Sequence, residues 1–456
     1  MIYKGKLLFI GLIMFGMLAF GTAMAQSETE YYTLEMCINI AKQHNIRLKN
    51  SRLDERSAHY QRKELLGMGL PQVNLKGNYN NFLEIFPQGI PGGLFDPNTS
   101  PDEIHVIAFG VPHSLKAGLE VSQLIFSQSY LVGLKAARSS EEFYYLLSKQ
   151  TEQEIIYEVT RNYYGVISAN LQKESLKANY DKIQGLKGII QSQVDNNLVR
   201  KVDLSRVNVN LITLETQMDE LEISLEQRIN YLKLLMAVPM TSTINFAPID
   251  LDWAEKAVHP ESMSADISNR YDLKTIEMRQ HLNELNVKNI AAGYYPTLSA
   301  FLDVNYNAFS NSLDFLSTSH NWFRGSLLGV QLNVPVFNGF QRKHQITQAR
   351  ITSEKLKGEE FNIRQSAAAE YFNASRKINN SLKGLFAQRD NVELSEEVFT
   401  QTENLYKEGL ASLTDLLDAE SALRESRSAY YRQAVNVKIA EADLLNATGN
   451  IDQVIN

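Results

Sequence analysis

Two acidic residues, Asp415 and Asp418, are the residues whose type and spacing point most directly to a function. They lie in the stretch YKEGLASLTDLLDAE (406–420), just after a turn at Gly409-Leu410. Residues three positions apart lie on one face of a helix, so the two carboxylates would attract cations together. Considered alone, the pair is better explained as solvated acids in the first turn of a helix, where the helix dipole favours negative charge.

Other reactive residue types form no recognisable site. The single Cys37 excludes an internal disulfide and a cysteine-based metal cluster, and is most simply a small core residue. The histidines include no pair at the i, i+4 spacing of a metal-binding helix: they are His44, His59, His105, His113, His259, His281, His320 and His344. There is no nucleophile elbow, P-loop or dinucleotide fingerprint. We therefore predict no enzyme activity, no metal site and no cofactor.

The composition and the N-terminal residues limit which partners the protein can have and in which compartment it can lie. The formal net charge of −7 argues against a nucleic acid bound through a basic face. Residues 1–25 have the basic start, short apolar run and Ala-Met-Ala ending of a secretory signal peptide. No later apolar stretch is long enough for a transmembrane helix. The sequence thus predicts an exported protein, either soluble in the periplasm or a β-barrel of the outer membrane.

The spacing between hydrophobic residues then changes repeatedly along the chain, between the helical period and strict alternation. Helical spacing predicts a helix over 33–66, and strict alternation predicts a strand over 71–86. The Gly- and Pro-rich residues 87–113 indicate a long exposed loop, and alternation returns over 115–126. A helix over 127–194 follows, then a turn at 195–199. A coiled-coil seam over 204–232 completes this half.

The second half repeats this order. After an irregular connector (241–264), the expected elements are a helix over 271–292, strands over 298–306 and 328–334 around a loop at 310–321, and helices over 341–407 and 413–448. The residues after Gly449 are expected to be loose. The chain therefore divides into a signal peptide (1–25), a first repeat (26–240), the connector (241–264), a second repeat (265–450) and a tail (451–456).

The strands set the fold class. Each alternating run is long enough to cross a membrane as a tilted strand. Four strands per chain cannot close a barrel, which needs roughly eight or more. Open edges are not tolerated in lipid, so other copies of the chain must complete the sheet, and three copies would give twelve strands. We predict an α+β membrane channel-tunnel with long coiled-coil hairpins, completed by trimerisation. The alternative is a periplasmic coiled-coil structural or adaptor protein without a pore, for which the amphipathic strands have no use.

Five motifs support a more specific assignment. Two are the strand openings, GLPQVNL (69–75) and YYPTLSAF (294–301), and two are the strand-to-helix joints, VSQLIFS (121–127) and NVPVFNGF (333–340). Each kind occurs once in each half, in the same order, and the fifth motif is the tip at 406–420. With them the chain resembles the TolC-type outer-membrane efflux proteins. The resemblance implies a homotrimer in outer-membrane lipid, with a twelve-stranded barrel and a periplasmic α-helical barrel. It also implies a passive duct of an efflux or type I secretion system that docks to a periplasmic adaptor (membrane fusion) protein and an inner-membrane pump of the RND or ABC type.

The resemblance also implies site residues. The family closes its periplasmic end through helix tips, and the matching gate and selectivity positions here are Asp203, Tyr406, Asp415 and Asp418. In a trimer, Asp415 and Asp418 would form acidic rings. The expected adaptor-docking tips are Asn197, Leu198, Val199, Gly409 and Leu410, with the apolar residues exposed. Where some members carry an arginine after the tip glycine, this chain has Ala411-Ser412, so Arg200 or Lys201 of the first tip could substitute.

Overall fold

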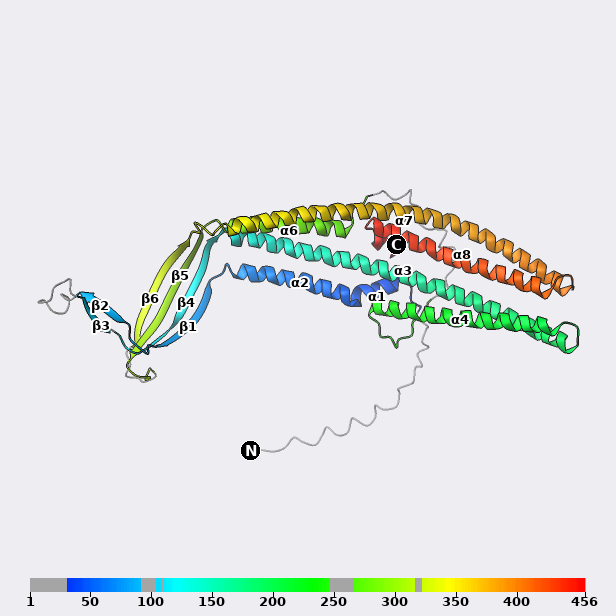
Figure 1. The fold of residues 1–456 in the computed structure, drawn as a ribbon, viewed down its shortest axis with the longest axis horizontal. Helices are drawn as coiled ribbons and strands as arrows, with labels where there is room; N and C mark the ends of the chain where they lie inside the picture. Colours follow the sequence, from blue (N-terminus) through cyan, green and yellow to red (C-terminus); the bar gives the residue numbers. More distant parts are fainter. Residues whose placement is uncertain (1–30, 92–103, 109, 247–265, 316–321, 456) are drawn as a thin grey trace, which may run out of the picture.

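The computed structural model describes residues 31–91, 104–108, 110–246, 266–315 and 322–455. A sheet lies at one end of an elongated molecule, and paired helices run from it to two tight turns at the other end (Figure 1). The expected signal peptide lies outside the described residues, as do residues 247–264 of the connector and parts of both loops.

The main elements of the two halves match in order, and the first half has one additional helix at its start. The first contains α1 (Leu34–His44), α2 (Ile46–Gly67), β1 (Gln72–Asn81), β4 (His113–Ser127), α3 (Gln128–Asp195) and α4 (Lys201–Met236). The second contains α6 (Tyr271–Ala292), β5 (Thr297–Ser310), β6 (Trp322–Asn333), α7 (Gln341–Lys407) and α8 (Leu413–Ala447). The long helices α3 and α7 have 68 and 67 residues, and α2 and α6 have 22 each. These lengths are those expected of an internal duplication.

Each long helix carries two shorter helices along its length. The helices α2 and α4 follow one another along α3, and α6 and α8 follow one another along α7 (Figure 1). The helix α3 also packs on α6 and α8 and so joins the two halves. The expected helix at 33–66 is interrupted at Asn45. Its side-chain oxygen accepts the N–H of Leu48 (3.2 Å) to start α2, and its amide donates to the carbonyl of Leu235 (2.7 Å).

The sheet is antiparallel throughout, in the order β1-β4-β5-β6. Its register separates two faces. Val73, Val121, Leu302 and Leu328 lie side by side on one face, because each is paired with the next. The other face carries Asn74, Glu120 and Asp303 in register, with ion pairs from Lys76 to Glu120 (2.5 Å) and from Lys116 to Asp303 (3.3 Å). The alternation predicted from the sequence is confirmed for all four strands.

Two expectations about irregular segments were wrong. Residues 87–113 are more than a loop, because β2 (Pro87–Pro91) and β3 (Ile104–Ala108) form a two-stranded sheet. Both strands have only five residues, and β2 also contains two prolines and a glycine, so neither shows a clear period of two. The tail is ordered too: residues 451–455 form a 3₁₀ helix, and Ile451 is fully buried. Gly449, at φ +73°, turns the chain back, and Gln153 of α3 donates to its carbonyl (2.8 Å).

The largest core lies midway along the helices, where α1, α3 and α4 meet the end of α8. Its buried members include Cys37, Ile155, Leu232, Met236 and Leu445. Cys37 was predicted to be a small core residue, and the structure confirms that it is buried in this core. Among the helices of the described ranges, none is both long enough and apolar enough to cross a membrane.

Candidate functional site at the helix tips

The two tips have the same backbone design. The N–H of Leu198 and the N–H of Leu410 each donate to the carbonyl five residues earlier, at 2.8 Å. The preceding residues, Asn197 (φ +58°) and Gly409 (φ +77°), occupy the left-handed region. This is the Schellman ending of a helix, and Gly and Asn are the residues that adopt it most readily. The turn expected at Gly409-Leu410 is confirmed, and Asn197 holds the place of Gly409 in the first tip.

Both tips present one large apolar side chain to solvent. Leu198 is 74 % exposed and Leu410 is 72 % exposed. A leucine at this position of a Schellman turn usually packs back on its own helix. Val199, which we expected to be exposed with them, is half-buried against the core that joins the two tips. Val199 therefore packs against the core of the tip and also lines the cavity described below.

Asp415 and Asp418 have different local roles, although both are exposed. The carboxylate of Asp415 accepts the backbone N–H (2.9 Å) and the hydroxyl (2.7 Å) of Ser412, while Ser412 Oγ accepts the N–H of Asp415 (3.1 Å). This capping box starts α8 and lowers the pKa of Asp415, chiefly through the Ser412 hydroxyl. Asp415 is therefore bound to its own helix start, and Asp418 is the freer of the two carboxylates to meet a passing ion.

Asp203 and Tyr406 line one cavity between the tips. Asp203 is only 8 % exposed and pairs with Arg200 of its own tip (3.3 Å). Burial raises the pKa of the half-buried Tyr406, and the charge of Asp203 raises it further. Arg200 is engaged with Asp203. Among the described residues, neither Arg200 nor Lys201 makes a hydrogen bond or ion pair to the second tip of the same chain, so their substitution for the family arginine stays a prediction.

A contact missed in the sequence joins the two hairpins instead. The guanidinium of Arg206, on α4, donates to the hydroxyl of Thr414, at the start of α8. Sequence reasoning considered only cations beside the turn, whereas Arg206 lies one and a half helical turns further along α4. An exposed arginine on a coiled-coil helix gives no signal of such a contact until the packing of the two hairpins is known.

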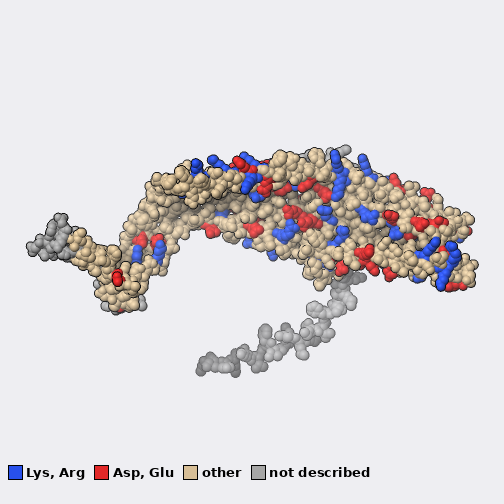
Figure 2. All heavy atoms as spheres, viewed as in Figure 1, with Lys and Arg blue, Asp and Glu red and all other residues tan. Residues whose placement is uncertain are grey.

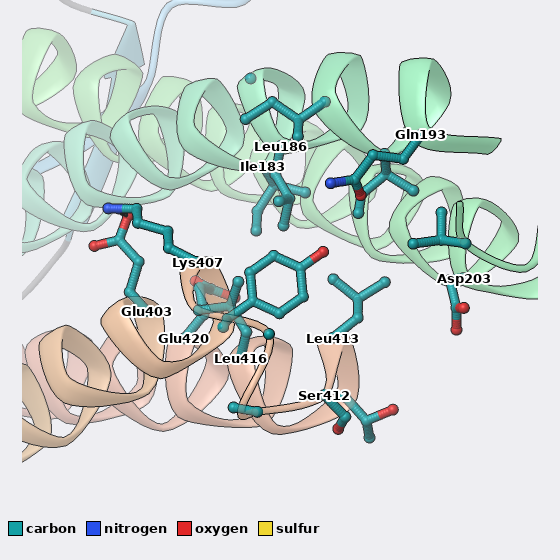
Figure 3. Close-up of a pocket in the computed structure, with 18 of the residues that line it drawn as sticks. Ile183, Leu186, Gln193, Asp203, Glu403, Lys407, Ser412, Leu413, Leu416 and Glu420 are labelled. Carbon is teal, nitrogen blue, oxygen red and sulfur yellow. Dashed lines mark ion pairs between the residues drawn. The ribbon is translucent and has the colours of Figure 1, made fainter. Parts of the chain in front are cut away.

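The hairpins enclose a cavity of about 870 Å³ next to this contact. Its walls are largely apolar: Ile183 and Leu186 of α3 face Leu413 and Leu416 of α8 (Figure 3). The deep end is formed by the acidic Glu420. Within the described ranges, no group of three His, Cys, Asp or Glu side chains could hold a metal ion.

Comparison with known proteins shows what this chain is similar to. A family model described as outer membrane efflux protein matches residues 264–450. The chain is 22 % identical over 251 residues to the toluene efflux pump outer membrane protein TtgC of Pseudomonas putida, a match that spans 54 % of this chain and 50 % of that protein. It is 22 % identical over 398 residues to outer membrane protein TolC of Vibrio cholerae, spanning 84 % of this chain and 83 % of that one.

Solved structures agree over a longer stretch. The CmeC outer membrane channel of Campylobacter jejuni superposes with a TM-score of 0.72 at 17 % identity, covering 92 % of this chain and 86 % of that one. The MtrE outer membrane channel of Neisseria gonorrhoeae, solved in its open state, gives 0.70 at 18 % identity, covering 92 % and 89 %. These likenesses establish the channel-tunnel fold of the protomer. The family match in the second half, the relatives that span both halves and this shared fold agree in relating the chain to outer-membrane efflux proteins.

Proposed function

We propose that the protein is the passive outer-membrane duct of a tripartite efflux or type I secretion system, formed by three copies of the chain and closed at its helix tips. The observation that carries the proposal is the two-faced sheet with open edges. Its apolar face is largely exposed, with Leu75 79 %, Val330 69 % and Leu328 77 % accessible. Exposing such an apolar face to water is unfavourable, whereas contact with lipid stabilises it.

The edges of the sheet favour closure by identical copies. In the described chain β1 and β6 are the outer strands, each paired on one side only. The strands alternate in direction across the sheet, so β6 of one copy runs antiparallel to β1 of the next. Three copies then form a closed antiparallel barrel of about twelve strands without an edge, as lipid requires.

An aromatic band marks the proposed membrane boundary. Tyr294, Tyr295, Phe337 and Phe340 are 47–75 % exposed, and all lie where strands join helices. Aromatic residues prefer the interface between lipid and water. Beyond the band, Lys, Arg, Asp and Glu cover the helical part, whereas few appear on the sheet in this view (Figure 2). This distribution supports a sheet in lipid and helices in the periplasm.

Exposed apolar stripes on the helices support contacts between copies. Val202, Val209 and Ile223 of α4 are 49, 64 and 58 % exposed and follow a spacing of seven. On α7, Leu394, Val398 and Leu405 are 63, 55 and 44 % exposed and lie on one face. Stripes of this spacing are seams of coiled coils. In the proposed trimer, the seam of one copy packs against its neighbour and encloses the periplasmic tunnel.

The described conformation is the closed one in this proposal. Arg206 and Thr414 hold the two hairpins of a chain together, and Tyr406 packs in the core between them. Leu198 and Leu410 are the exposed side chains that a periplasmic adaptor would cover. In this proposal the inner-membrane pump, of the RND or ABC type, supplies the energy and selects the cargo.

The proposal is tested by purifying the protein from outer-membrane fractions and recording its conductance in planar lipid bilayers. We expect an oligomer that survives detergent without boiling, converts to monomer on heating and conducts ions. A soluble periplasmic monomer without conductance would instead support the alternative, a coiled-coil structural or adaptor protein without a pore.

The acidic positions give a prediction about selectivity. Asp418→Ala is expected to weaken block by a trivalent cation such as hexaamminecobalt by roughly tenfold, because a ring of three exposed carboxylates is lost. Asp415→Asn is expected to have less effect on block, because this carboxylate is engaged with Ser412. The measurement is block of bilayer conductance against cation concentration. Equal block in Asp418→Ala and the unmodified protein would show that Asp418 does not line the passage.

A further inference from the structure

Glu420 is the one strongly buried acid at the tips whose position neither the gate nor the fold explains. It lies on α8 at the deep end of the cavity between the hairpins and is 4 % exposed. Within the part of the chain that the structure describes, neither of its carboxylate oxygens makes a hydrogen bond of ordinary geometry. The amide of Asn179 on α3 lies beside this carboxylate and lowers its pKa as a donor, but it too makes no hydrogen bond of ordinary geometry. A buried carboxylate without hydrogen bonds is rare in folded proteins, because it has lost water without a replacement.

The nearby cations are engaged elsewhere. Arg424 approaches only to 3.8 Å through Nε, while its Nη groups donate to Gln217 of α4 (3.0 Å) and to Ser421 (2.9 Å). Lys182 of α3 lies over the ring of Phe399, with its Nζ 5.4 Å from the ring centroid. The positive charges of Arg424 and Lys182 therefore act on the Glu420 carboxylate, but neither side chain donates a hydrogen bond to it.

The other charged groups around the cavity are already paired. From α7, Glu403 pairs with Lys407 (3.1 Å) at the cavity wall. On the far side of Glu420, Arg427 of α8 pairs with Glu396 of α7 (2.8 Å). Arg200 and Asp203 of the first tip pair with each other. Glu420 is thus the charged group of this wall whose hydrogen-bonding capacity is unused.

We propose that this cavity is a binding site for a small hydrophobic primary amine, whose ammonium group donates hydrogen bonds to Glu420 and whose apolar body lies between α3 and α8. The volume of about 870 Å³ is in the range of small-molecule sites. Its apolar walls, with Phe399 and Tyr406 at the α7 side, match a hydrocarbon or aromatic body. A primary ammonium supplies three donors, which is what two unpaired carboxylate oxygens lack.

The site belongs to one protomer, since α3, α7 and α8 of a single chain line it. Binding therefore does not depend on the proposed trimer. A bound amine bridges the two hairpins of the chain and holds them together. Its effect on conductance, a lower open fraction, rests on the proposed function, whereas the binding itself can be measured without it.

The test is calorimetric titration of the full-length protein in detergent with 4-phenylbutylamine, and with 4-phenylbutanol as its uncharged counterpart. Micelles without protein give the blank for partition into detergent. We expect the amine to bind at least tenfold more tightly than the alcohol, as for a hydrogen bond to a charged group. Glu420→Gln, which keeps shape but removes the charge, is expected to weaken amine binding by at least tenfold. Glu408→Gln is the matched control, because it changes an exposed acid of the same tip that does not line the cavity, and its amine affinity is expected to stay within about twofold.

The pH dependence gives an independent reading. Burial raises the pKa of Glu420, against the opposing effects of Arg424, Asn179 and Lys182. Amine binding is therefore expected to weaken as the pH falls and the carboxylate gains a proton, and this loss begins at a higher pH than for an ordinary glutamate; alcohol binding is expected not to follow. Equal affinities for amine and alcohol, unchanged amine affinity in Glu420→Gln, or no heat above the micelle blank would each overturn the proposal. Circular dichroism and unboiled gel migration of Glu420→Gln check that the variant is folded.

Discussion

Arg206→Ala is expected to raise the open fraction of the channel in planar bilayers by on the order of 100-fold. Its guanidinium donates the hydrogen bond that joins the first hairpin to the start of α8. A hydrogen bond of this kind stabilises the closed arrangement by about 1 kcal/mol. If the three tips of the proposed trimer open together, the three contributions add to about 3 kcal/mol, which is about 100-fold in population.

Two further variants separate the contact from the loss of charge. Thr414→Val removes the accepting hydroxyl and keeps the shape of the side chain, so it should open the channel as much as Arg206→Ala. The double variant should open it no further, because both changes remove one interaction. Lys201→Ala removes an exposed positive charge from the same helix and should leave the open fraction within about twofold. An equal effect of Lys201→Ala would assign the opening to tip charge rather than to the Arg206–Thr414 contact.

The repeated elements of this fold could be predicted because many residues carry the same signal. The helix at 271–292 was placed correctly at both ends, and the four strands were recognised by their alternation. A period sustained over 20 or more residues outweighs the local preference of any one of them. The break at Asn45 was missed for the same reason, because the apolar spacing continues through it while its side chain caps α2.

The candidate site could be predicted only in part, because its contacts depend on how the two hairpins pack. A glycine after a long helical pattern predicts a turn, and Gly409 has the left-handed backbone conformation of such a turn. Val199 looks like Leu198 in the sequence, yet Val199 is half-buried against the core of the tip and Leu198 is exposed. Arg206 and Thr414 are 208 positions apart, and no local pattern connects them. Nor does any pattern in the sequence indicate that Glu420 is buried without a hydrogen bond.

The sheet itself offers the sharpest test of the proposed membrane position, through two adjacent leucines of β6. Leu328 and Leu327 are 77 % and 58 % exposed and point to opposite faces. Leu328 belongs to the apolar face, beside Leu302, whereas Leu327 lies opposite Asp303 on the polar face. In the proposed barrel the first meets lipid and the second lines the lumen.

Leu328→Arg is therefore expected to abolish the heat-modifiable oligomer in the outer membrane, because an arginine facing the middle of the bilayer costs about 2–4 kcal/mol per chain. Leu327→Arg carries the same change one residue earlier, but its guanidinium would lie near the Asp303 carboxylate in water, so the oligomer should persist. Unboiled gel migration of outer-membrane fractions compares the two variants directly. Loss of the oligomer only in Leu327→Arg would mean that the polar face meets lipid. Persistence in both variants would mean that this sheet is not in the membrane, because no lipid-facing strand accommodates an arginine at its centre without loss of stability.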